Sequence, residues 1–245
     1  IHPMQVKFVD SIERIGRERW NQVAGTNYPF TRYEFLHALE VSGATDRESG
    51  WQPHHLVVYE SNSDQPIALM PLYLKYHSYG EYVFDWSWAD AYAQHNVEYY
   101  PKFVNAIPFT PATGPRLCIK AGTDEDNVYS TVATSLIQQA ESLNVSSIHI
   151  LFPTPAVSDR WQELGLNKRR GAQYHWYNHN FTNFDDFLST FSSRKRKNLN
   201  KERKRVEEQS LRLEVLQGPD ISPEIWQRFY YFYQLTYAKR SGHGG

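Results

Sequence analysis

A dense run of basic residues is the part of this sequence with the most readable chemistry. Eight of the twelve residues from 194 to 205 are Lys or Arg, yet the formal net charge of the 245-residue chain is only −1. Such a concentration of like charge repels itself, so solvent, an acidic surface or an anionic ligand must offset it. On a helix that begins after Ser193, one side becomes a basic ridge. The ridge consists of Arg194, Lys197, Asn198, Lys201, Lys204 and Arg205.

The position of this ridge favours an anionic ligand. A helix N-terminus carries partial positive charge, which adds to Arg194 and Lys195. Leu199 and Val206 fall on the flank that is expected to pack inward. Phosphate, pyrophosphate and carboxylate groups would all suit such a surface. The alternative is a solvated face, or a patch that merely resembles a nuclear localisation signal.

A second candidate site is the aromatic stretch over residues 78–92, which also contains carboxylates. Interpreted as a strand, residues 82–88 place Asp85 on one face and Trp86 and Trp88 on the other. Carboxylates among large aromatic side chains suit a polar ligand with apolar faces, such as a sugar, a peptide or a nucleotide. An aromatic core with carboxylates at its edge is the alternative. The candidate binding residues are Asp85, Trp86, Trp88, Asp90 and Tyr92.

A proline-rich segment, residues 108–116, is the third candidate. Its prolines withhold backbone donors, so Thr113 and Arg116 could line a cleft where a strand is interrupted.

Other chemistries are not favoured. The sequence has no nucleophile elbow and no Walker or dinucleotide glycine signature. It also has no Cys/His zinc spacing, so no metal site is expected. Cys118 is expected to be a core residue.

The elements that must position these residues follow from periodicity and turn signals. Ser11 is expected to cap a first helix that runs towards Gly25, and Thr31 with Glu34 forms a capping-box pattern for a second helix. A hairpin, further strands and two helices follow. We expect strands at 55–59, 66–75, 82–88, 147–152 and 173–178, a short helical piece at 100–105, an extended segment at 107–119, and helices at 125–143 and 157–164. Beyond these we expect two helices, a strand at 211–216 and a helix that Ser222 and Pro223 open.

This order predicts an α/β fold in which a mixed sheet carries helices on its faces. Residues 1–180 would form a first domain, and residues 181–245 would begin a second. Hydrophobic residues make up 40% of the chain and aromatics 15%, which is enough for a sizeable core. No apolar run has the length of a membrane span, and no signal peptide is evident. A single cysteine fits a reducing compartment, so the cytoplasm is the expected location. The first residue is not Met, and the last residues follow directly on a strong helix, which suggests a piece of a longer chain.

Five blocks of the sequence resemble a known bacterial family. Residues 31–36, 51–56, 78–86, 108–116 and 192–198 look like the FemAB-like predicted N-acyltransferases, which are often labelled peptidoglycan biosynthesis/recognition. The blocks occur in the family's order over nearly the whole chain, which makes the resemblance more specific than any one block. It implies a tandem of two GNAT-like acyltransferase domains, of which this chain would supply the first and the opening of the second.

The resemblance implies acyl or aminoacyl transfer to an amine. Relatives that build peptidoglycan cross-bridges take the aminoacyl group from tRNA, in a cleft between two domains. By analogy, the aromatic stretch would shape the acceptor pocket, while Arg194, Lys195, Lys197 and Asn198 would hold anionic oxygens. The catalytic base stays unassigned. A small-molecule or glycopeptide substrate and tRNA are the partners considered. Two alternatives stay open, namely a non-catalytic recognition module for an anionic glycopeptide and a nucleic-acid-binding protein.

One loop departs from the acyl-CoA pattern. GNAT domains that bind acyl-CoA hold its pyrophosphate on a glycine-rich loop at the start of the central helix. Here residues 121–128 read Ala-Gly-Thr-Asp-Glu-Asp-Asn-Val, and the three acidic side chains suit the helix dipole but repel phosphate. We therefore expect no CoA pyrophosphate at this loop and no tightly bound cofactor. Acyl-CoA or aminoacyl-tRNA would be a co-substrate held elsewhere.

Overall fold

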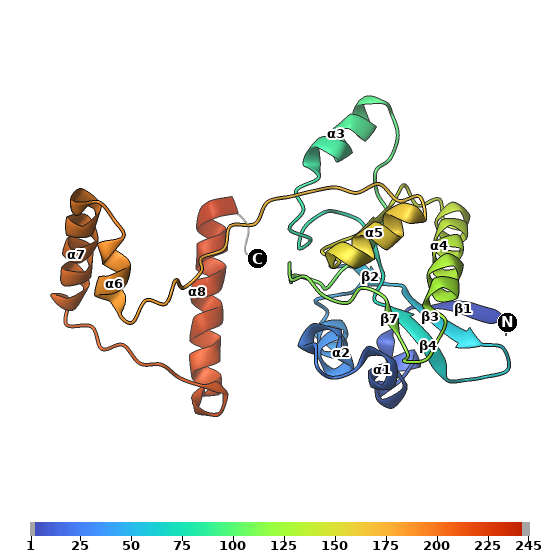
Figure 1. The fold of residues 1–245 in the computed structure, drawn as a ribbon, viewed down its shortest axis with the longest axis horizontal. Coiled ribbons are helices and arrows are strands. Elements are labelled where there is room, and N and C mark those ends of the chain that lie inside the picture. The colour runs from blue at the N-terminus through green and yellow to red at the C-terminus, as the bar shows by residue number, and fades with distance from the viewer. Residues whose placement is uncertain (1–2, 242–245) are drawn as a thin grey trace. The chain divides into compact units, whose positions relative to one another are not determined.

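The computed structural model describes residues 3–241 and divides the chain into two compact units. The first unit ends at Gln173 and contains both β-sheets, whereas the second begins at Tyr174 and contains helices and extended segments (Figure 1). The sequence predicted the boundary between residues 180 and 181. The start of a second GNAT-like domain stays a prediction.

An antiparallel sheet forms one part of the first unit. Its strand order is β1-β3-β4-β7. The strands are β1 (Met4–Val9), β3 (His55–Glu60), β4 (Pro66–Met70) and β7 (Cys118–Ile119). The loop between β3 and β4 confirms the predicted hairpin. The sequence analysis missed β1, which pairs with β3 along its whole length from Met4↔Glu60 to Val9↔His55.

The second sheet is mixed. Its strand order is β2-β5-β6-β8, and the β6–β8 pair is parallel while the other pairs are antiparallel. The strands are β2 (Trp51–Pro53), β5 (Tyr73–Lys75), β6 (Lys102–Asn105) and β8 (Ile148–Ile150). The helical piece predicted at 100–105 is wrong, because this segment pairs with strands on both sides and all four residues of β6 are buried. Tertiary pairing overrides local propensity here.

Helices cover both faces of these sheets. The helices of the first unit are α1 (Arg17–Ala24), α2 (Tyr33–Val41), α3 (Trp86–Gln94), α4 (Glu125–Ser142) and α5 (Pro155–Glu163). Leu56 and Val58 of β3 join a hydrophobic cluster with α4 and α5, whereas Val57 joins a cluster with α1 and α2. This alternation is what a strand with two covered faces requires. Figure 1 shows α4 and α5 on one side of the sheets and α1 and α2 on the other. The predicted α/β class is confirmed.

Two predicted helix starts differ from the structure. Ser11 caps a short 3₁₀ helix, η1 (Ile12–Arg14), and Gly16 at φ 88° separates it from α1. The capping box is wrong, because Arg32 and not Thr31 is the N-cap of α2, and no side chain accepts a hydrogen bond from the helix N–H groups there. Thr31 itself ends a second 3₁₀ helix, η2 (Pro29–Thr31), before α2 begins. The expected helices at 125–143 and 157–164 are confirmed as α4 and α5.

Three predicted strands are absent from the described residues. Residues 82–88 form an irregular stretch that leads into α3, and residues 173–178 and 211–216 are extended without strand pairing. All three segments contain β-branched or aromatic residues. Their side chains are largely exposed, so strand propensity finds no partner there.

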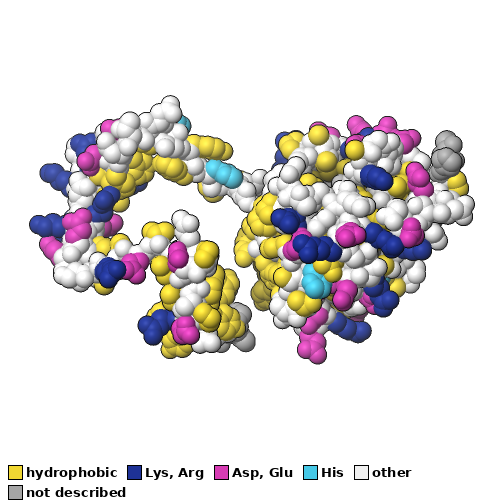
Figure 2. Space-filling view, turned by 90° about the horizontal axis from the view of Figure 1, so that it is seen from below, with side chains coloured by type: hydrophobic (Ala, Val, Ile, Leu, Met, Phe, Trp, Pro, Cys, Tyr) yellow, Lys and Arg dark blue, Asp and Glu magenta, His cyan; other side chains and the backbone are white. Residues whose placement is uncertain are grey.

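The second unit consists of helices with little buried surface. It contains α6 (Phe184–Ser189), α7 (Ser193–Glu207), η3 (Gly218–Asp220) and α8 (Pro223–Ser241). The Ser222 hydroxyl accepts from the Ile225 N–H at 3.4 Å, which confirms the predicted cap of α8. Figure 2 shows broad hydrophobic areas on this unit's surface. None of the helices in residues 3–241 has the length and hydropathy that a bilayer span requires.

Candidate functional site

An irregular backbone characterises the segment at residues 78–88, which we name the aromatic segment. Gly80, Tyr82 and Phe84 have φ values of 80°, 61° and 55°. Left-handed backbone is uncommon for residues other than glycine and costs free energy unless surrounding contacts enforce it. The segment therefore takes its shape from tertiary contacts rather than from strand pairing.

Large aromatic side chains of this segment face solvent. Phe84 is 73% exposed, Tyr79 66% and Trp86 42%. Tyr82 and Trp88 are exposed as well. Exposed aromatic side chains gathered in one segment are a common feature of binding sites. Helix α3, which continues the segment, buries none of its residues and stands away from both sheets (Figure 1).

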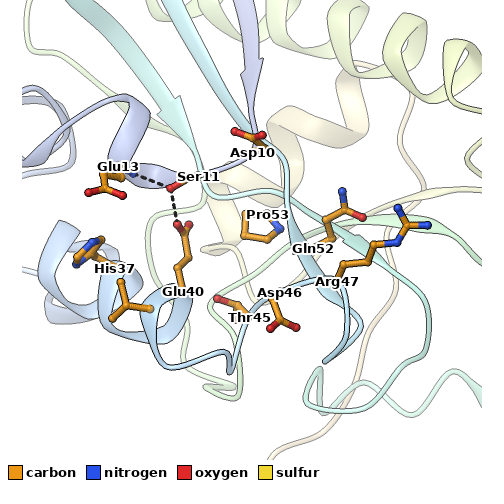
Figure 3. A pocket seen from close by; sticks show the side chains of 11 residues that line it. Asp10, Ser11, Glu13, His37, Glu40, Thr45, Asp46, Arg47, Gln52 and Pro53 are labelled. Carbon is orange, nitrogen blue, oxygen red and sulfur yellow. Dashed lines mark hydrogen bonds between the residues drawn. The ribbon is translucent and has the colours of Figure 1, made fainter.

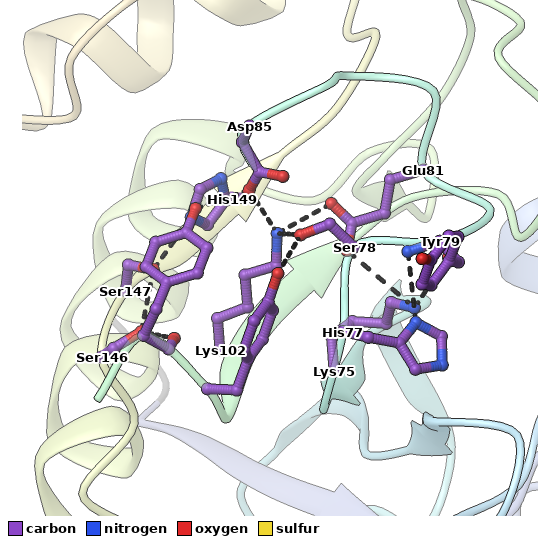
Figure 4. A network of polar contacts seen from close by, with 12 residues as sticks. Lys75, His77, Ser78, Tyr79, Glu81, Asp85, Lys102, Ser146, Ser147 and His149 are labelled. Atoms are coloured by element: carbon purple, nitrogen blue, oxygen red, sulfur yellow. Dashed lines mark hydrogen bonds and ion pairs between the residues drawn. The ribbon is translucent and has the colours of Figure 1, made fainter. Parts of the chain in front are cut away.

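A buried lysine lies beneath the aromatic segment (Figure 4). The Nζ of Lys102, on β6, is 2.6 Å from the Oδ2 of Asp85, 2.9 Å from the Oε2 of Glu81 and 2.9 Å from the Oγ of Ser78. All three partners belong to the aromatic segment and all are buried. Lys102 thereby joins three positions of an irregular segment to the central part of the mixed sheet.

A second buried lysine balances the charge of this cluster. The Nζ of Lys75 donates to the carbonyl of Tyr79 at 3.0 Å, lies 3.9 Å from Glu81 and sits 3.8 Å from the ring centre of Trp51. The pKa of Lys75 is lowered to about 7, chiefly by burial; Glu81 opposes the shift and the neighbouring Lys102 adds to it. Burial likewise raises the pKa of Glu81. Two buried lysines thus lie beside two buried carboxyl groups, as buried ionisable groups require.

Asp85 is the most strongly held carboxylate of the cluster. The Tyr99 hydroxyl donates to its Oδ2 at 2.5 Å, in addition to the contact from Lys102. Burial alone would raise the pKa of Asp85, but these hydrogen bonds outweigh it and hold the pKa at about 2. His149, on β8, lies 3.4 Å from the same Tyr99 hydroxyl. Burial, and then repulsion by Lys102, lowers the pKa of His149 to about 4, so its imidazole is neutral at pH 7.

The faces of α3 divide the predicted aromatic and acidic residues into two groups. Trp86 and the exposed Asp90 are four residues apart, so they share one face of α3. The Tyr79 ring lies 5.1 Å from that of Trp86. The other face is occupied, because the Arg169 guanidinium lies 4.8 Å from the Trp88 ring and the Tyr92 ring lies 5.0 Å from that of Tyr99. The open face is therefore formed by Tyr79, Trp86 and Asp90.

The proline-rich segment supplies no free cation. Arg116 is 1% exposed, and its guanidinium donates to the carbonyls of Leu151 at 2.6 Å, Ala112 at 2.5 Å and Pro115 at 3.0 Å. It organises the loop rather than facing a ligand. Thr113 is exposed, and its backbone carbonyl accepts from the Tyr28 hydroxyl at 3.4 Å.

The basic helix α7 presents its cations on two different sides. Lys195 lies 4.5 Å from the ring centre of Phe191, Arg203 lies 4.1 Å from that of Phe184, and Arg196 donates to the carbonyl of Phe191 at 3.0 Å. These three face the α6 side of the second unit. The exposed row on the other side consists of Arg194, Lys197, Asn198, Lys201, Lys204 and Arg205. Of the predicted apolar seam, Leu199 is half-buried whereas Val206 is 46% exposed.

Comparison with known proteins gives a family match over almost the whole chain. A family model described as peptidoglycan biosynthesis/recognition matches residues 11–244. The chain belongs to the FemAB-like family. The resemblance seen in the sequence is thereby confirmed. A search of curated proteins finds no match to this FemAB-like chain.

Comparison with solved structures gives matches of low identity, and several of them are acetyltransferases. An aminoglycoside antibiotic 6'-N-acetyltransferase of Acinetobacter baumannii is 9% identical, with a TM-score of 0.40 over 72% of this chain and 99% of that one. Glucosamine-6-phosphate N-acetyltransferase of Arabidopsis thaliana gives the same values, 9% identity and a TM-score of 0.40 over 72% and 99% of the two chains. A possible acetyltransferase of Clostridium difficile 630 is 7% identical, with a TM-score of 0.38 over 71% and 97%.

A hollow of about 370 Å³ lies elsewhere in the FemAB-like chain, near η1 and α2 (Figure 3). Two of its carboxylates, Asp10 and Glu40, have protein partners. Asp10 pairs with Arg14 at 2.5 Å, and Glu40 accepts from the Ser11 hydroxyl at 3.0 Å and faces the Nε2 of His55 at 2.8 Å. These contacts tie η1 to α2 and β3, so the hollow is explained by structural roles.

The acidic loop before α4 in this FemAB-like chain also has defined partners. Asp124 caps α4 by accepting from the Asn127 N–H at 3.2 Å, and Arg160 of α5 pairs with Glu125 at 2.9 Å and with Asp126. The acidic residues therefore stabilise the helix start, as the dipole argument requires. The exclusion of CoA pyrophosphate from this loop stays a prediction.

Metal and thiol chemistry find no support in the described part of the chain. Among those residues, no group of three or more His, Cys, Asp or Glu side chains is arranged to hold a metal ion. His175 and His179 are four residues apart, but they lie in extended backbone and not on a helix. Cys118 is buried in the core, and burial raises the pKa of its thiol to about 12.

Asp85 was expected to bind a ligand, whereas in the structure it is buried and pairs with Lys102 and Tyr99. The sequence patterns did not single out the other charged members of the cluster, Lys102, Glu81 and Lys75. A signal was present, since Lys75 ends an apolar run that was predicted as a strand and Lys102 stands among aromatic and apolar residues. A lysine almost never lies in a core without a carboxylate partner.

Proposed function

We propose that this FemAB-like protein is an N-acyltransferase that moves an acyl or aminoacyl group onto the amine of a peptidoglycan-derived acceptor. Family membership over residues 11–244 supports the reaction class and the acceptor class. The observation that carries the assignment to a site is the open face of α3, where the exposed rings of Tyr79 and Trp86 adjoin the exposed carboxylate of Asp90.

This face matches the chemistry of a glycopeptide amine. The apolar face of a sugar ring stacks on an exposed indole or phenol, which contributes apolar burial without requiring a deep pocket. A carboxylate next to these rings pairs with the ammonium group of the acceptor. Asp90 and Trp86 are one helical turn apart, which brings both functions within reach of one small ligand.

The reaction is an aminolysis. The ammonium group of the bound acceptor first loses a proton to water. The nitrogen lone pair of the resulting neutral amine attacks the carbonyl carbon of a thioester or ester donor, a C–N bond forms, and the C–S or C–O bond breaks as the thiolate or alkoxide leaves. The proton of the attacking nitrogen passes to a carboxylate or to water. We assign Asp90 to acceptor binding and leave the base unassigned. The proposed donor is acyl-CoA or aminoacyl-tRNA, and the proposed location of the reaction is the cytoplasm.

The anionic part of a substrate is assigned to helix α7. Arg194, Lys197 and Asn198 belong to its exposed row and would hold phosphate or carboxylate oxygens. Lys195 is exposed but already lies over the Phe191 ring, so its share in binding would be smaller. The exposed row consists of the same residues as the ridge that the helical projection of the sequence predicted.

The test combines turnover with site variants. The chain is incubated with acetyl-CoA or with alanyl-tRNA and a muramyl tripeptide that carries a free side-chain amine, and the acylated product is detected by its mass. Trp86→Ala and Asp90→Asn are each expected to raise KM for the tripeptide about tenfold, which corresponds to about 1.4 kcal/mol of lost binding. Ile137→Ala, which removes an exposed apolar side chain of α4, is the control and should leave KM unchanged.

The same assay separates catalysis from recognition. Calorimetric binding of the tripeptide that is weakened by Trp86→Ala, with no acylated product from either donor, would indicate the non-catalytic recognition module. Absence of both binding and turnover would contradict the proposed function.

A further inference from the structure

We propose that Lys102 is a positioning residue that holds the aromatic segment in its ligand-binding conformation. The inference rests on the proposed role of the open face of α3 in binding the acceptor. Lys102 itself is fully buried and touches no solvent, so it acts through the segment that it holds.

The hydrogen-bonding capacity of Lys102 is completely used by this one segment. An ammonium group has three N–H donors and no acceptor. Ser78, Glu81 and Asp85 lie 2.9, 2.9 and 2.6 Å from the Nζ, so the three contacts account for the three donors. A single charged group therefore fixes three positions that are spaced three and four residues apart.

Besides Lys102, the buried Lys75 holds the first part of the aromatic segment through the Tyr79 carbonyl and Glu81. The backbone of the segment before α3 forms neither strand nor helix, and it passes through three left-handed residues. The Gly80 carbonyl accepts from the Phe109 N–H at 3.1 Å, and the Tyr79 carbonyl accepts from the Trp51 indole at 3.1 Å. Both contacts lie in the first part of the segment. Towards α3, Asp85 is held by Lys102 and Tyr99.

Asp85 transmits this restraint to the open face. It occupies the N-cap position of α3, and its carbonyl accepts from the Trp88 N–H at 2.9 Å in the first turn. The direction of α3 therefore depends on where Asp85 is held. Trp86 follows Asp85 directly and Asp90 lies one turn further, so both ligand-facing side chains are placed relative to β6 through Lys102.

Burial makes this arrangement close to all-or-none. If the segment moved away, the Lys102 ammonium would remain in the sheet without a partner, and an uncompensated buried charge is strongly unfavourable. The open face is thus expected to be preformed in the ligand-free protein. Preorganisation of this kind improves affinity because no ordering cost is left for binding.

Amide hydrogen exchange in the ligand-free chain tests this inference without reference to any ligand. In Lys102→Met, exchange of the amides at 88–94 in α3 is expected to increase at least tenfold, while the amides of α4 at 129–140 keep their protection. Ser78→Ala, which removes the contacts of this hydroxyl with Lys102 and Tyr100 but leaves no extra buried charge, should produce a smaller change in the same direction. Ser147→Ala is the matched control, because its hydroxyl bonds to His149 at 2.9 Å and not to the segment.

Binding of the muramyl tripeptide supplies the second measurement. Lys102→Met is expected to weaken binding at least tenfold and Ser78→Ala about threefold, because in Ser78→Ala the Lys102 ammonium keeps its two carboxylate partners. Unchanged exchange in α3, or an equal increase in α3 and α4, would overturn the positioning role. If Lys102→Met does not fold, Ser78→Ala decides by the same criteria. If the unmodified protein does not bind the tripeptide, the proposed function fails, and the exchange data alone still decide the role of Lys102.

Discussion

Among single residues, His149 shows how the buried cluster controls protonation. The Nε2 of its imidazole lies 2.9 Å from the Ser147 hydroxyl and 3.4 Å from the Tyr99 hydroxyl. Burial and the nearby Lys102 disfavour a further positive charge, so the pKa falls to about 4. The cluster contains two lysines already, and a charged His149 would leave it with excess positive charge.

This shift predicts acid sensitivity that can be assigned to one residue. Between pH 6.5 and 4 the unfolded chain binds a proton at His149 and the folded chain does not, so the contribution to stability is fully present above about pH 6.5 and is lost towards pH 4. Lowering the pH from 7 to 5 is expected to reduce the free energy of unfolding by about 2 kcal/mol through this group. Urea unfolding of the unmodified chain and of His149→Gln at both pH values measures it. The variant should lose about 2 kcal/mol less than the unmodified chain, whereas His175→Gln, at an exposed position, should match the unmodified chain. Equal losses in all three proteins would contradict the assignment.

Among the elements, the aromatic segment depends on a close approach at Gly80. A Cβ at this position would lie 2.7 Å from the Cδ1 of Phe109 and 3.1 Å from the indole nitrogen of Trp51. Gly122 has a similar φ, 83° against 80°, but a Cβ there would meet nothing within 4 Å. The two glycines therefore separate backbone strain from steric conflict.

This pair gives a prediction with its own control. Gly122→Ala is expected to cost about 1 kcal/mol, from the left-handed backbone alone. Gly80→Ala should cost about 1–3 kcal/mol more, because the added methyl group forces Phe109 and the segment apart. Urea unfolding measures both, and exchange of the α3 amides should increase in Gly80→Ala alone. Equal costs for the two substitutions would show that the contact with Phe109 is readily relieved.

The elements that sequence patterns predicted are those stabilised by local signals. The β3–β4 hairpin has a polar loop between two apolar runs, and α4 has a cap at Asp124 with apolar residues at helical spacing. The aromatic segment has strong strand propensity but no strand partner. Strand β6, by contrast, pairs with β5 and β8, and nothing in its own residues predicts this pairing. Pairing between distant strands is a property of the whole fold and leaves no periodicity to read.

The candidate site was predictable in part for the same reason. Asp85, Trp86 and Asp90 could be selected because carboxylates among exposed aromatics are poorly explained by packing. Lys102 lies 17 residues from Asp85 and 21 from Glu81, so their contacts depend on the path of the chain between them. For Arg116 the prediction failed in the opposite direction. It was expected to line a cleft, but its guanidinium donates to three backbone carbonyls and is not free to bind a ligand.

At the scale of the whole molecule, the hydrophobic clusters are found in the first unit. All three clusters seen in the described residues consist of residues before position 167. In the second unit, by contrast, Leu188 is 2% exposed, whereas large side chains of α8 such as Trp226 and Phe229 are more than half exposed. The first unit therefore supplies most of the burial that stabilises the described chain.

The net charge of the whole molecule is close to zero, so any tRNA binding by the exposed row of α7 should be a local effect with its own salt dependence. The chain has a net charge of −1, so it exerts no long-range attraction on a polyanion, and at physiological salt each charge acts over about 8 Å. Binding of tRNA must then come from the row itself. Lys197→Gln with Lys201→Gln is expected to weaken tRNA binding and to reduce the slope of log K against log salt by about 1.4–1.8, since each lost phosphate contact contributes about 0.7–0.9.

Lys195→Gln with Arg203→Gln removes the same charge from side chains that lie over Phe191 and Phe184, and should change the slope by less than half as much. Equal changes in both double variants would show that total charge, and not the row, governs binding, and an unmodified chain that does not bind tRNA would leave acyl-CoA as the proposed donor.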